Sequence, residues 1–178
     1  MFDLRSDKTM GYHLFFEPKG EAYNLLQEHI VKLAEISGGP CFMPHITLLA
    51  RIPLETENHL ITKTNELANT IQSFSVTVGE VGMEDAYYRA LYRHIVPEDL
   101  VQKAHTTAIE LFGMKEARVF LPHLSLLYGN FTEDEKQTFL SSLGTLDDIQ
   151  LEIDEVHLYQ TEGGTHQWKK VFSCPLGQ

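Results

Sequence analysis

A six-residue phrase that occurs twice is the feature that most limits how this chain can fold. Its first copy, Pro-His-Ile-Thr-Leu-Leu, covers residues 44–49, and its second, Pro-His-Leu-Ser-Leu-Leu, covers residues 122–127. Each copy has a histidine and a hydroxyl residue two positions apart in an apolar run that predicts a strand, so both side chains face one side of a sheet. The two phrases can therefore form two sides of one site.

The elements predicted around the phrases also repeat. His45 lies 27 residues after Pro18, and His123 lies 26 residues after Pro97, with a helical pattern in each interval. The predicted order is strand 12–17, helix 21–36, strand 45–50, helix 55–71, strands 74–81 and 87–95, a helix from 97, strand 123–128, a helix opened by a capping box at 132 and 135 and ending at 143, and strands 149–158 and 168–173. This order predicts an ancient duplication within one domain over residues 1–178, with halves at approximately 11–95 and 87–175.

Composition narrows the range of partners. The chain has 178 residues, of which 25 are acidic and 14 are basic, and its net charge is -11. A protein that binds a nucleic-acid backbone usually carries clustered Lys and Arg, so we expect no long nucleic acid as a partner. A small anionic substrate held in a local pocket is compatible with this charge.

The cysteines and the apolar runs indicate the compartment. Cys41 and Cys174 are too few for a disulfide framework and lack the spacing of a zinc or redox site. The first ten residues contain charges and no apolar stretch, and no later run reaches the length needed to cross a membrane. We therefore predict a cytoplasmic protein that does not bind a membrane, and we expect a monomer.

A third histidine-x-threonine sequence, His105 to Thr107, shows that the motif alone is weak evidence. It lies in a helical pattern, where residues i and i+2 point about 200° apart and cannot converge. It also lacks the preceding proline and the following Leu-Leu pair. We interpret this copy as chance.

Two facing histidines suit the hydrolysis of a cyclic phosphodiester. One ring must take a proton from water while the other protonates the departing ribose oxygen. An unperturbed histidine pKa of about 6.5 allows one neutral and one charged ring near neutral pH. The hydroxyls of Thr47 and Ser125 can donate hydrogen bonds to the non-bridging phosphate oxygens. This scheme requires neither a metal nor a cofactor.

The paired phrases resemble those of the 2H phosphoesterase superfamily, and the run from His123 to Tyr128 resembles its cyclic phosphodiesterase branch. The resemblance implies an α+β fold of two lobes, each with an antiparallel β-sheet and flanking helices, and an active site in the cleft between them. It also implies metal-independent hydrolysis of a small cyclic nucleotide, either a nucleoside 2′,3′-cyclic phosphate or ADP-ribose 1″,2″-cyclic phosphate.

The resemblance assigns roles to the residues of both phrases. His45 and His123 would be the acid/base pair, and Thr47 and Ser125 the phosphate ligands. By analogy with members that leave a 2′-phosphate, His123 is assigned as the base and His45 as the acid. Tyr128 matches a phosphate-binding tyrosine, although strict alternation from His123 would place it on the opposite face of the strand.

Other residues are weaker candidates for substrate contacts. Phe15 falls near the position where similar proteins place an aromatic that contacts the base, and His13 alternates with it on the first strand. Trp168 corresponds to Tyr88 in the internal repeat, and each stands beside a cation, so the pair could frame a nucleotide or simply fill edge positions. The available sources of positive potential are Arg51, Arg89, Lys169 and Lys170.

Two other functions remain open at this stage. A 2′-5′ phosphodiesterase or RNA-end-processing enzyme would use the same phrases on longer RNA, and a basic stripe along its cleft would be expected. A non-catalytic nucleotide-binding module would not need both an acid and a base, so the intact histidines and hydroxyls count against it.

Overall fold

The computed structural model describes residues 6–115 and 119–177, which form strands, helices and two short 3-10 turns. The elements are β1 (Tyr12–Phe16), α1 (Gly20–Ser37), β2 (Ile46–Ile52), α2 (Glu57–Thr70), β3 (Phe74–Met83), η1 (Tyr87–Arg89), β4 (Leu91–Val96), α3 (Glu98–Phe112), β5 (His123–Leu127), α4 (Glu133–Leu143), β6 (Ile149–Ile153), β7 (Glu155–Gln160), η2 (Thr165–Gln167) and β8 (Lys169–Pro175).

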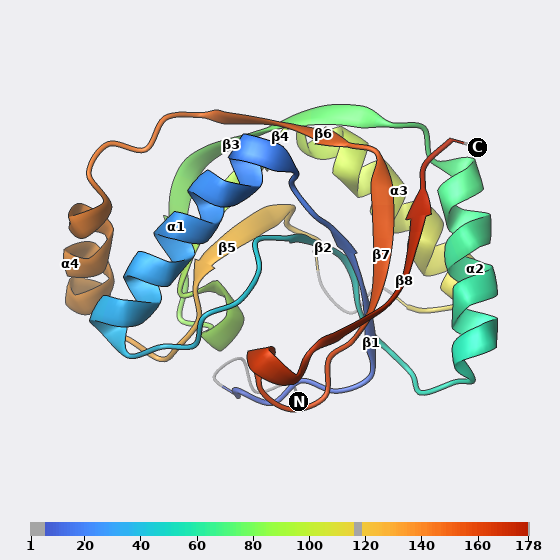
Figure 1. Cartoon of the computed structure of the whole chain (residues 1–178), viewed down its shortest axis with the longest axis horizontal. Coiled ribbons are helices and arrows are strands. Elements are labelled where there is room, and N and C mark those ends of the chain that lie inside the picture. The colour runs from blue at the N-terminus through green and yellow to red at the C-terminus, as the bar shows by residue number, and fades with distance from the viewer. Residues whose placement is uncertain (1–5, 116–118, 178) are drawn as a thin grey trace.

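The described strands form one sheet in the order β6-β3-β4-β5-β2-β1-β7-β8, and every pairing in it is antiparallel. Figure 1 shows the sheet curling, with β3, β4 and β6 along one side and β1, β7 and β8 along another. The two sides join between β2 and β5, where Ile46 lies opposite Leu124. This junction divides the sheet into two four-stranded lobes, and the predicted α+β class is confirmed.

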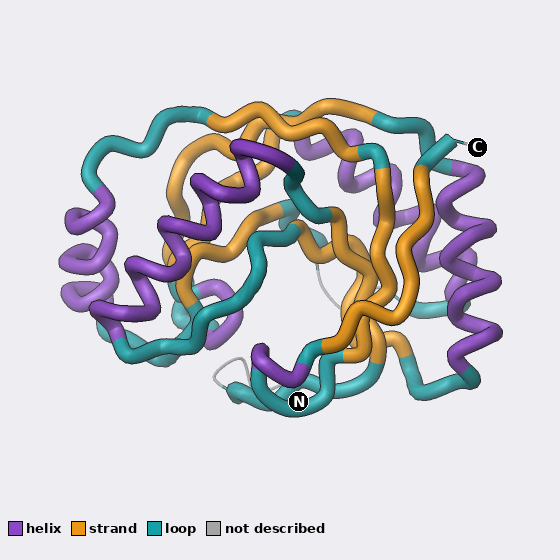
Figure 2. The backbone as a smooth tube through the Cα atoms, viewed as in Figure 1, coloured by secondary structure: helices purple, strands orange, loops and turns teal. Residues whose placement is uncertain are grey.

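Each lobe takes strands from both halves of the chain. One lobe contains β1, β2, β7 and β8, and the other contains β3, β4, β5 and β6. Helix α2 contacts β7 and β8 and packs against α3, whereas α1 contacts β5 and β6 and packs against α4. Figure 2 shows these helix pairs on opposite sides of the molecule. The predicted repeat halves therefore interleave in space, and their common origin stays a prediction.

Local sequence explains where the helices begin and end. The buried side chains of α1, at Leu26, Ile30, Leu33 and Ala34, recur at intervals of three and four residues and cover the sheet. Gly38 ends the helix at φ 71°, a left-handed conformation that glycine adopts without steric cost. None of the described helices is long and apolar enough to cross a membrane.

The predicted capping box at the start of α4 is confirmed. The backbone N–H of Glu135 donates to the Thr132 hydroxyl at 3.3 Å, and the backbone N–H of Thr132 donates to the Glu135 carboxylate at 2.8 Å. These two bonds satisfy donors that would otherwise be unpaired at the helix N-terminus.

Each of the two phrases contains a β-bulge at the same position. In each strand the register against its neighbour slips by one residue directly after the hydroxyl residue, at Leu48 in β2 and at Leu126 in β5. An extra residue of this kind is a β-bulge, which bends a strand and re-aims its side chains. Matching bulges at equivalent positions support the predicted duplication.

The strand predicted over residues 87–95 is wrong at its start. Residues Tyr87–Arg89 form a 3-10 turn in which the N–H of Arg89 donates to the Ala86 carbonyl at 3.0 Å, and β4 begins only at Leu91. The aromatic composition favours a strand, but the Tyr87 carbonyl instead accepts from the N–H of Gly129, which follows β5. This turn places Tyr88 beside the candidate site.

Candidate active site

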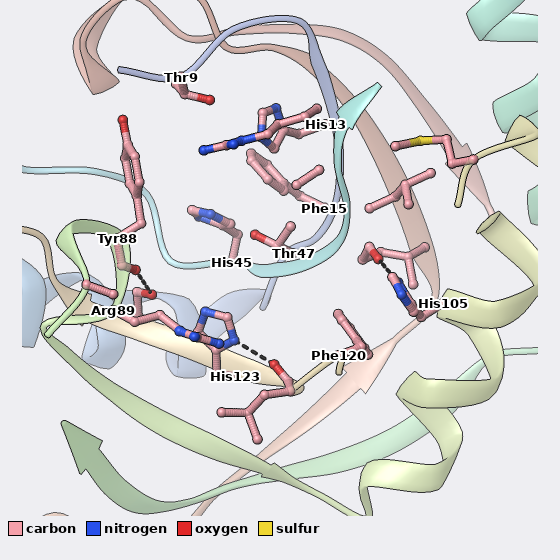
Figure 3. Close-up of a pocket in the computed structure, with 18 of the residues that line it drawn as sticks. Thr9, His13, Phe15, His45, Thr47, Tyr88, Arg89, His105, Phe120 and His123 are labelled. Carbon is pink, nitrogen blue, oxygen red and sulfur yellow. Dashed lines mark hydrogen bonds between the residues drawn. The ribbon is translucent and has the colours of Figure 1, made fainter. Parts of the chain in front are cut away.

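A cavity of about 370 Å³ is lined by residues of both lobes where the two phrases meet. His45, Thr47, His123 and Ser125 all line it. Figure 3 shows His45 and Thr47 on one strand and His123 on the other, with their side chains directed toward the same space. The structure therefore brings together the four residues that the sequence singled out.

The two histidine rings are held in the same way. Nδ1 of His45 lies 2.8 Å from the carbonyl oxygen of Met43, and Nδ1 of His123 lies 2.7 Å from that of Leu121. A carbonyl oxygen can only accept, so each Nδ1 carries the hydrogen and donates it. Pro44 and Pro122 each lie between a histidine and the residue whose carbonyl accepts its bond. A proline restricts its own φ and the conformation of the residue before it, which helps to fix the direction of that carbonyl. Nε2 is then the atom of each ring that can exchange a proton with a substrate.

Burial keeps both rings neutral. It lowers the pKa of His45 to about 4 and that of His123 to about 4, while the backbone carbonyl bonds act in the opposite direction because they favour the charged ring. The positive charge of Arg89 further lowers the pKa of His123, and a charge on His45 would do the same. The two histidines are therefore coupled, and both are uncharged at pH 7 in the free protein.

The two hydroxyl residues are not equivalent. Thr47 is half-buried and lies beside His45 in the cavity (Figure 3). Ser125 is buried, and its hydroxyl donates to the backbone carbonyl of Tyr88 at 2.8 Å. Its proton is therefore engaged with the protein, and the hydroxyl must rotate before it can donate to a phosphate oxygen.

Tyr128 reaches the site from outside the strand. It follows the last residue of β5, so strand alternation no longer fixes its direction, and the next residue, Gly129, has a φ of 147°. The Tyr128 hydroxyl lies 3.4 Å from Nε2 of His45 in the other lobe. Its ring stacks on Phe42 with centroids 3.7 Å apart and planes 9° apart. Tyr128 thus contacts Nε2 of His45 directly.

Aromatic rings gather around His45. The Phe15 ring is centred 4.0 Å from the His45 ring, and Trp168 is centred 6.0 Å from it. Trp168 and Tyr88, which correspond in the predicted repeat, lie 6.4 Å apart, and all three aromatic residues line the cavity. The structure therefore places Phe15 and Trp168 where they could contact a nucleotide.

His13, on β1 of the same lobe as His45, also lines the cavity. Its Nδ1 lies 2.5 Å from the hydroxyl of the buried Thr161. Burial lowers the pKa of His13 to about 3, with the charges of His45 and Arg51 contributing. This ring is consequently neutral and can offer a substrate hydrogen bonds but no charge.

The described lining of the cavity contains cations and no carboxylate, although the protein as a whole is acidic. No Asp or Glu occurs among the described residues that line it, whereas the whole chain has 25 acidic residues. Arg51, Arg89 and Lys115 do line it, and Arg89 also pairs with Glu84 at 2.5 Å. An anion is favoured in the cavity because of the charges in its lining, and the net charge of the whole chain does not predict this.

Two expected cations lie elsewhere. Lys169 and Lys170 are absent from the described cavity lining, and Lys170 instead pairs with Glu17 at 2.8 Å. Their position next to Trp168 in the sequence therefore does not bring either lysine into the described lining of the cavity. Within the described residues, no three His, Cys, Asp or Glu side chains are grouped closely enough to hold a metal ion.

Sequence reasoning missed the structural importance of His105. Thr107 bonds back to its own helix at Lys103, as expected for a chance motif, but the His105 ring is buried and lines the cavity. Its Nδ1 donates to the carbonyl of Leu48, the bulge residue of β2, at 2.6 Å, and its ring stacks on Phe120. The position of His105 on the apolar face of α3 was the signal that could have predicted its burial.

A two-lobed antiparallel fold with paired histidines across one cavity is the class of structure expected of a 2H phosphoesterase. The chain belongs to the 2′-5′ RNA ligase superfamily, whose family model matches residues 32–165. It is also similar to a protein from Arabidopsis thaliana named cyclic phosphodiesterase, with 23% identity over 145 residues that cover 78% of this chain and 80% of that protein. The predicted resemblance is therefore confirmed at the level of the family.

Solved structures share the fold at low sequence identity. The structure of E. coli LigT complexed with 3'-AMP has a TM-score of 0.66 at 15% identity, covering 96% of this chain and 100% of that chain. The protein TT0787 of Thermus thermophilus has a TM-score of 0.63 at 14% identity, covering 93% of this chain and 97% of that chain. These similarities establish the common architecture.

Proposed function

We propose that this protein hydrolyses a small cyclic phosphodiester, a nucleoside 2′,3′-cyclic phosphate or ADP-ribose 1″,2″-cyclic phosphate, to its phosphomonoester. The observation that carries the proposal is the matched Nδ1 bonding of His45 and His123, which leaves an Nε2 atom on each side of one cavity. An in-line displacement needs a proton acceptor and a proton donor in such an arrangement.

The proposed reaction is a single displacement at phosphorus. Nε2 of His123 takes a proton from water as the water oxygen bonds to phosphorus. The bond from phosphorus to the 3′ oxygen breaks, and Nε2–H of His45 protonates that oxygen, which leaves a 2′-phosphate. The order of the two histidines follows the analogy with family members. Thr47 lies beside His45 and can donate to a non-bridging oxygen.

The size and charge of the cavity support a small anionic substrate. Its volume of about 370 Å³ falls within the range typical of small-molecule sites, roughly 300–1,000 Å³. Its described lining has cations and no carboxylate. The name of the Arabidopsis thaliana relative, cyclic phosphodiesterase, points to the same substrate class.

The test is turnover of both cyclic phosphates in excess chelator by the wild-type protein and by the His45→Ala and His123→Ala variants. We expect wild-type activity to persist and each variant to lose at least about a hundredfold in kcat, as for other acid/base residues. Loss of activity in chelator would contradict a metal-independent reaction. Full activity of either variant would exclude the two-histidine mechanism.

A 2′-5′ phosphodiesterase is the second candidate, because the matching family model is described as the 2'-5' RNA ligase superfamily. The two candidates differ in substrate. Cleavage of 2′-5′ linked dinucleotides by a protein that leaves both cyclic phosphates intact would favour the second.

A further inference from the structure

The backbone of Arg51 has an unusual conformation. Its φ is 59°, which makes it the one non-glycine residue with positive φ in the described part of the chain. The register of β1 against β2 also slips there, because Tyr12 lies opposite Ile52 while Leu14 lies opposite Leu49. A side chain with a Cβ is disfavoured in this left-handed region, and such outliers concentrate at binding sites.

The second half of the chain adopts positive φ at the corresponding position with a glycine. Arg51 follows His45 by six residues, and Gly129, with a φ of 147°, follows His123 by six. Glycine meets this requirement without a steric cost. Arg51 therefore has a backbone conformation that is disfavoured for arginine, at a position six residues after its histidine. Its side chain is then a candidate for a specific role in the cavity that it lines.

The surroundings of Arg51 suit an anion. It lines the cavity together with Ser6, Thr9, His13 and Tyr88. Its positive charge lowers the pKa of His13 and opposes the rise in the pKa of Tyr88, so the guanidinium lies within electrostatic reach of both side chains. The hydroxyls of Ser6 and Thr9 add hydrogen-bond donors to this part of the lining.

This part of the cavity lies away from His123. In Figure 3, Thr9, His13 and the ring of Tyr88 occupy one end of the view, while His123 lies at the other side of His45. The guanidinium group of arginine presents its N–H donors in a fixed planar fork. Planar recognition of this kind matches a phosphate group.

We propose that Arg51, with the hydroxyls of Ser6 and Thr9, forms a second anion site that binds a phosphate group of the substrate other than the one being hydrolysed. The inference rests on the proposed cyclic phosphodiesterase function and narrows its substrate class. The preferred substrate then carries an additional phosphate or pyrophosphate, whereas a simple nucleoside cyclic phosphate leaves this site unused.

The test compares adenosine 2′,3′-cyclic phosphate with the same compound bearing a 5′-phosphate. We expect wild-type kcat/KM to be about tenfold or more higher for the 5′-phosphorylated compound, mainly through KM. Arg51→Gly, which suits the left-handed backbone, should reduce that ratio to near one, and Arg51→Lys should retain part of it. Lys169→Gln removes the same charge from an exposed side chain outside the cavity lining and should leave the ratio unchanged.

Direct binding separates this inference from the proposed function. Calorimetry with inorganic pyrophosphate should show binding to the wild type that weakens at least about tenfold in Arg51→Gly and does not change in Lys169→Gln. Equal binding to wild type and Arg51→Gly, or a substrate ratio that Arg51→Gly preserves, would overturn the second anion site. If pyrophosphate binds through Arg51 but neither cyclic phosphate is hydrolysed, the anion site stands and the proposed function fails.

Discussion

The hydroxyl of Tyr128 lies 3.4 Å from Nε2 of His45, although the two residues belong to different lobes. Nδ1 of His45 donates to the Met43 carbonyl, so Nε2 of the neutral ring can only accept, and Tyr128 is its donor. Burial raises the pKa of Tyr128, which keeps its hydroxyl protonated at pH 7. Tyr128 follows His123 by five residues, and the residue that follows His45 by five is Ala50. Alanine has no hydroxyl, so the first half of the chain does not supply His123 with a contact of this kind.

Protonation of His45 at Nε2 ends this contact and leaves the Tyr128 hydroxyl able to donate to the substrate phosphate. We therefore expect Tyr128→Phe to lower kcat by roughly fivefold, the rate equivalent of one hydrogen bond worth about 1 kcal/mol. The stacking of the ring on Phe42 is retained in this variant, so the melting temperature should change little. Steady-state kinetics on a cyclic nucleotide gives the measurement. Tyr23→Phe, which removes a partly buried hydroxyl bonded to Gln27, is the matched control. An unchanged kcat in Tyr128→Phe would show that the contact has no part in the reaction.

Phosphate binding should be accompanied by proton uptake. The pKa values of His45 and His123 are about 4 in the free protein, yet one ring must be charged to act as the acid. A bound anion favours the charged ring and therefore raises its pKa. NMR titration of the ring signals, without and with inorganic phosphate, should show one of the two pKa values shifted upward. Phosphate-independent pKa values for both rings would refute the expectation.

Stability should decrease when the pH falls from about 6.5 toward 4. The folded-state pKa values of His45 and His123, at about 4, and of His13, at about 3, lie below the unfolded value of about 6.5. The unfolded chain therefore binds more protons in this interval, and folding is penalised as the pH drops. Urea unfolding across the interval measures the slope.

Replacement of a buried histidine removes its contribution to the dependence of the free energy of unfolding on pH. His45→Gln should make the loss of unfolding free energy with falling pH shallower. Identical slopes for wild type and His45→Gln would contradict the assigned pKa.

Replacement of His105 tests its structural role. His105→Ala removes the bond to the Leu48 carbonyl and the stacking on Phe120, and a buried carbonyl left without its donor costs about 2 kcal/mol. We expect the free energy of unfolding to fall by at least that amount. Thr107→Ala should have a much smaller effect, since its hydroxyl donates a solvent-exposed hydrogen bond to the Lys103 carbonyl of the same helix. If Thr107→Ala abolished turnover while the fold persisted, the third motif would be functional after all.

The amino-acid sequence alone predicted the central residues of the candidate site, because the pattern that identifies them lies within two short segments. A repeated phrase with alternating side chains is enough to predict that His45, Thr47, His123 and Ser125 face one side of a sheet. The same reasoning predicted the capping box at Thr132, whose partners lie within one helical turn.

The tertiary structure decided everything that depends on register and on contacts between distant segments. The bulge that holds Arg51, the bond from His105 to Leu48 and the reach of Tyr128 to His45 each join elements far apart in the chain. The absence of carboxylates from the described cavity lining likewise follows from how the lobes fold together. Composition counts the charges of a chain, but only packing determines which of them face the substrate.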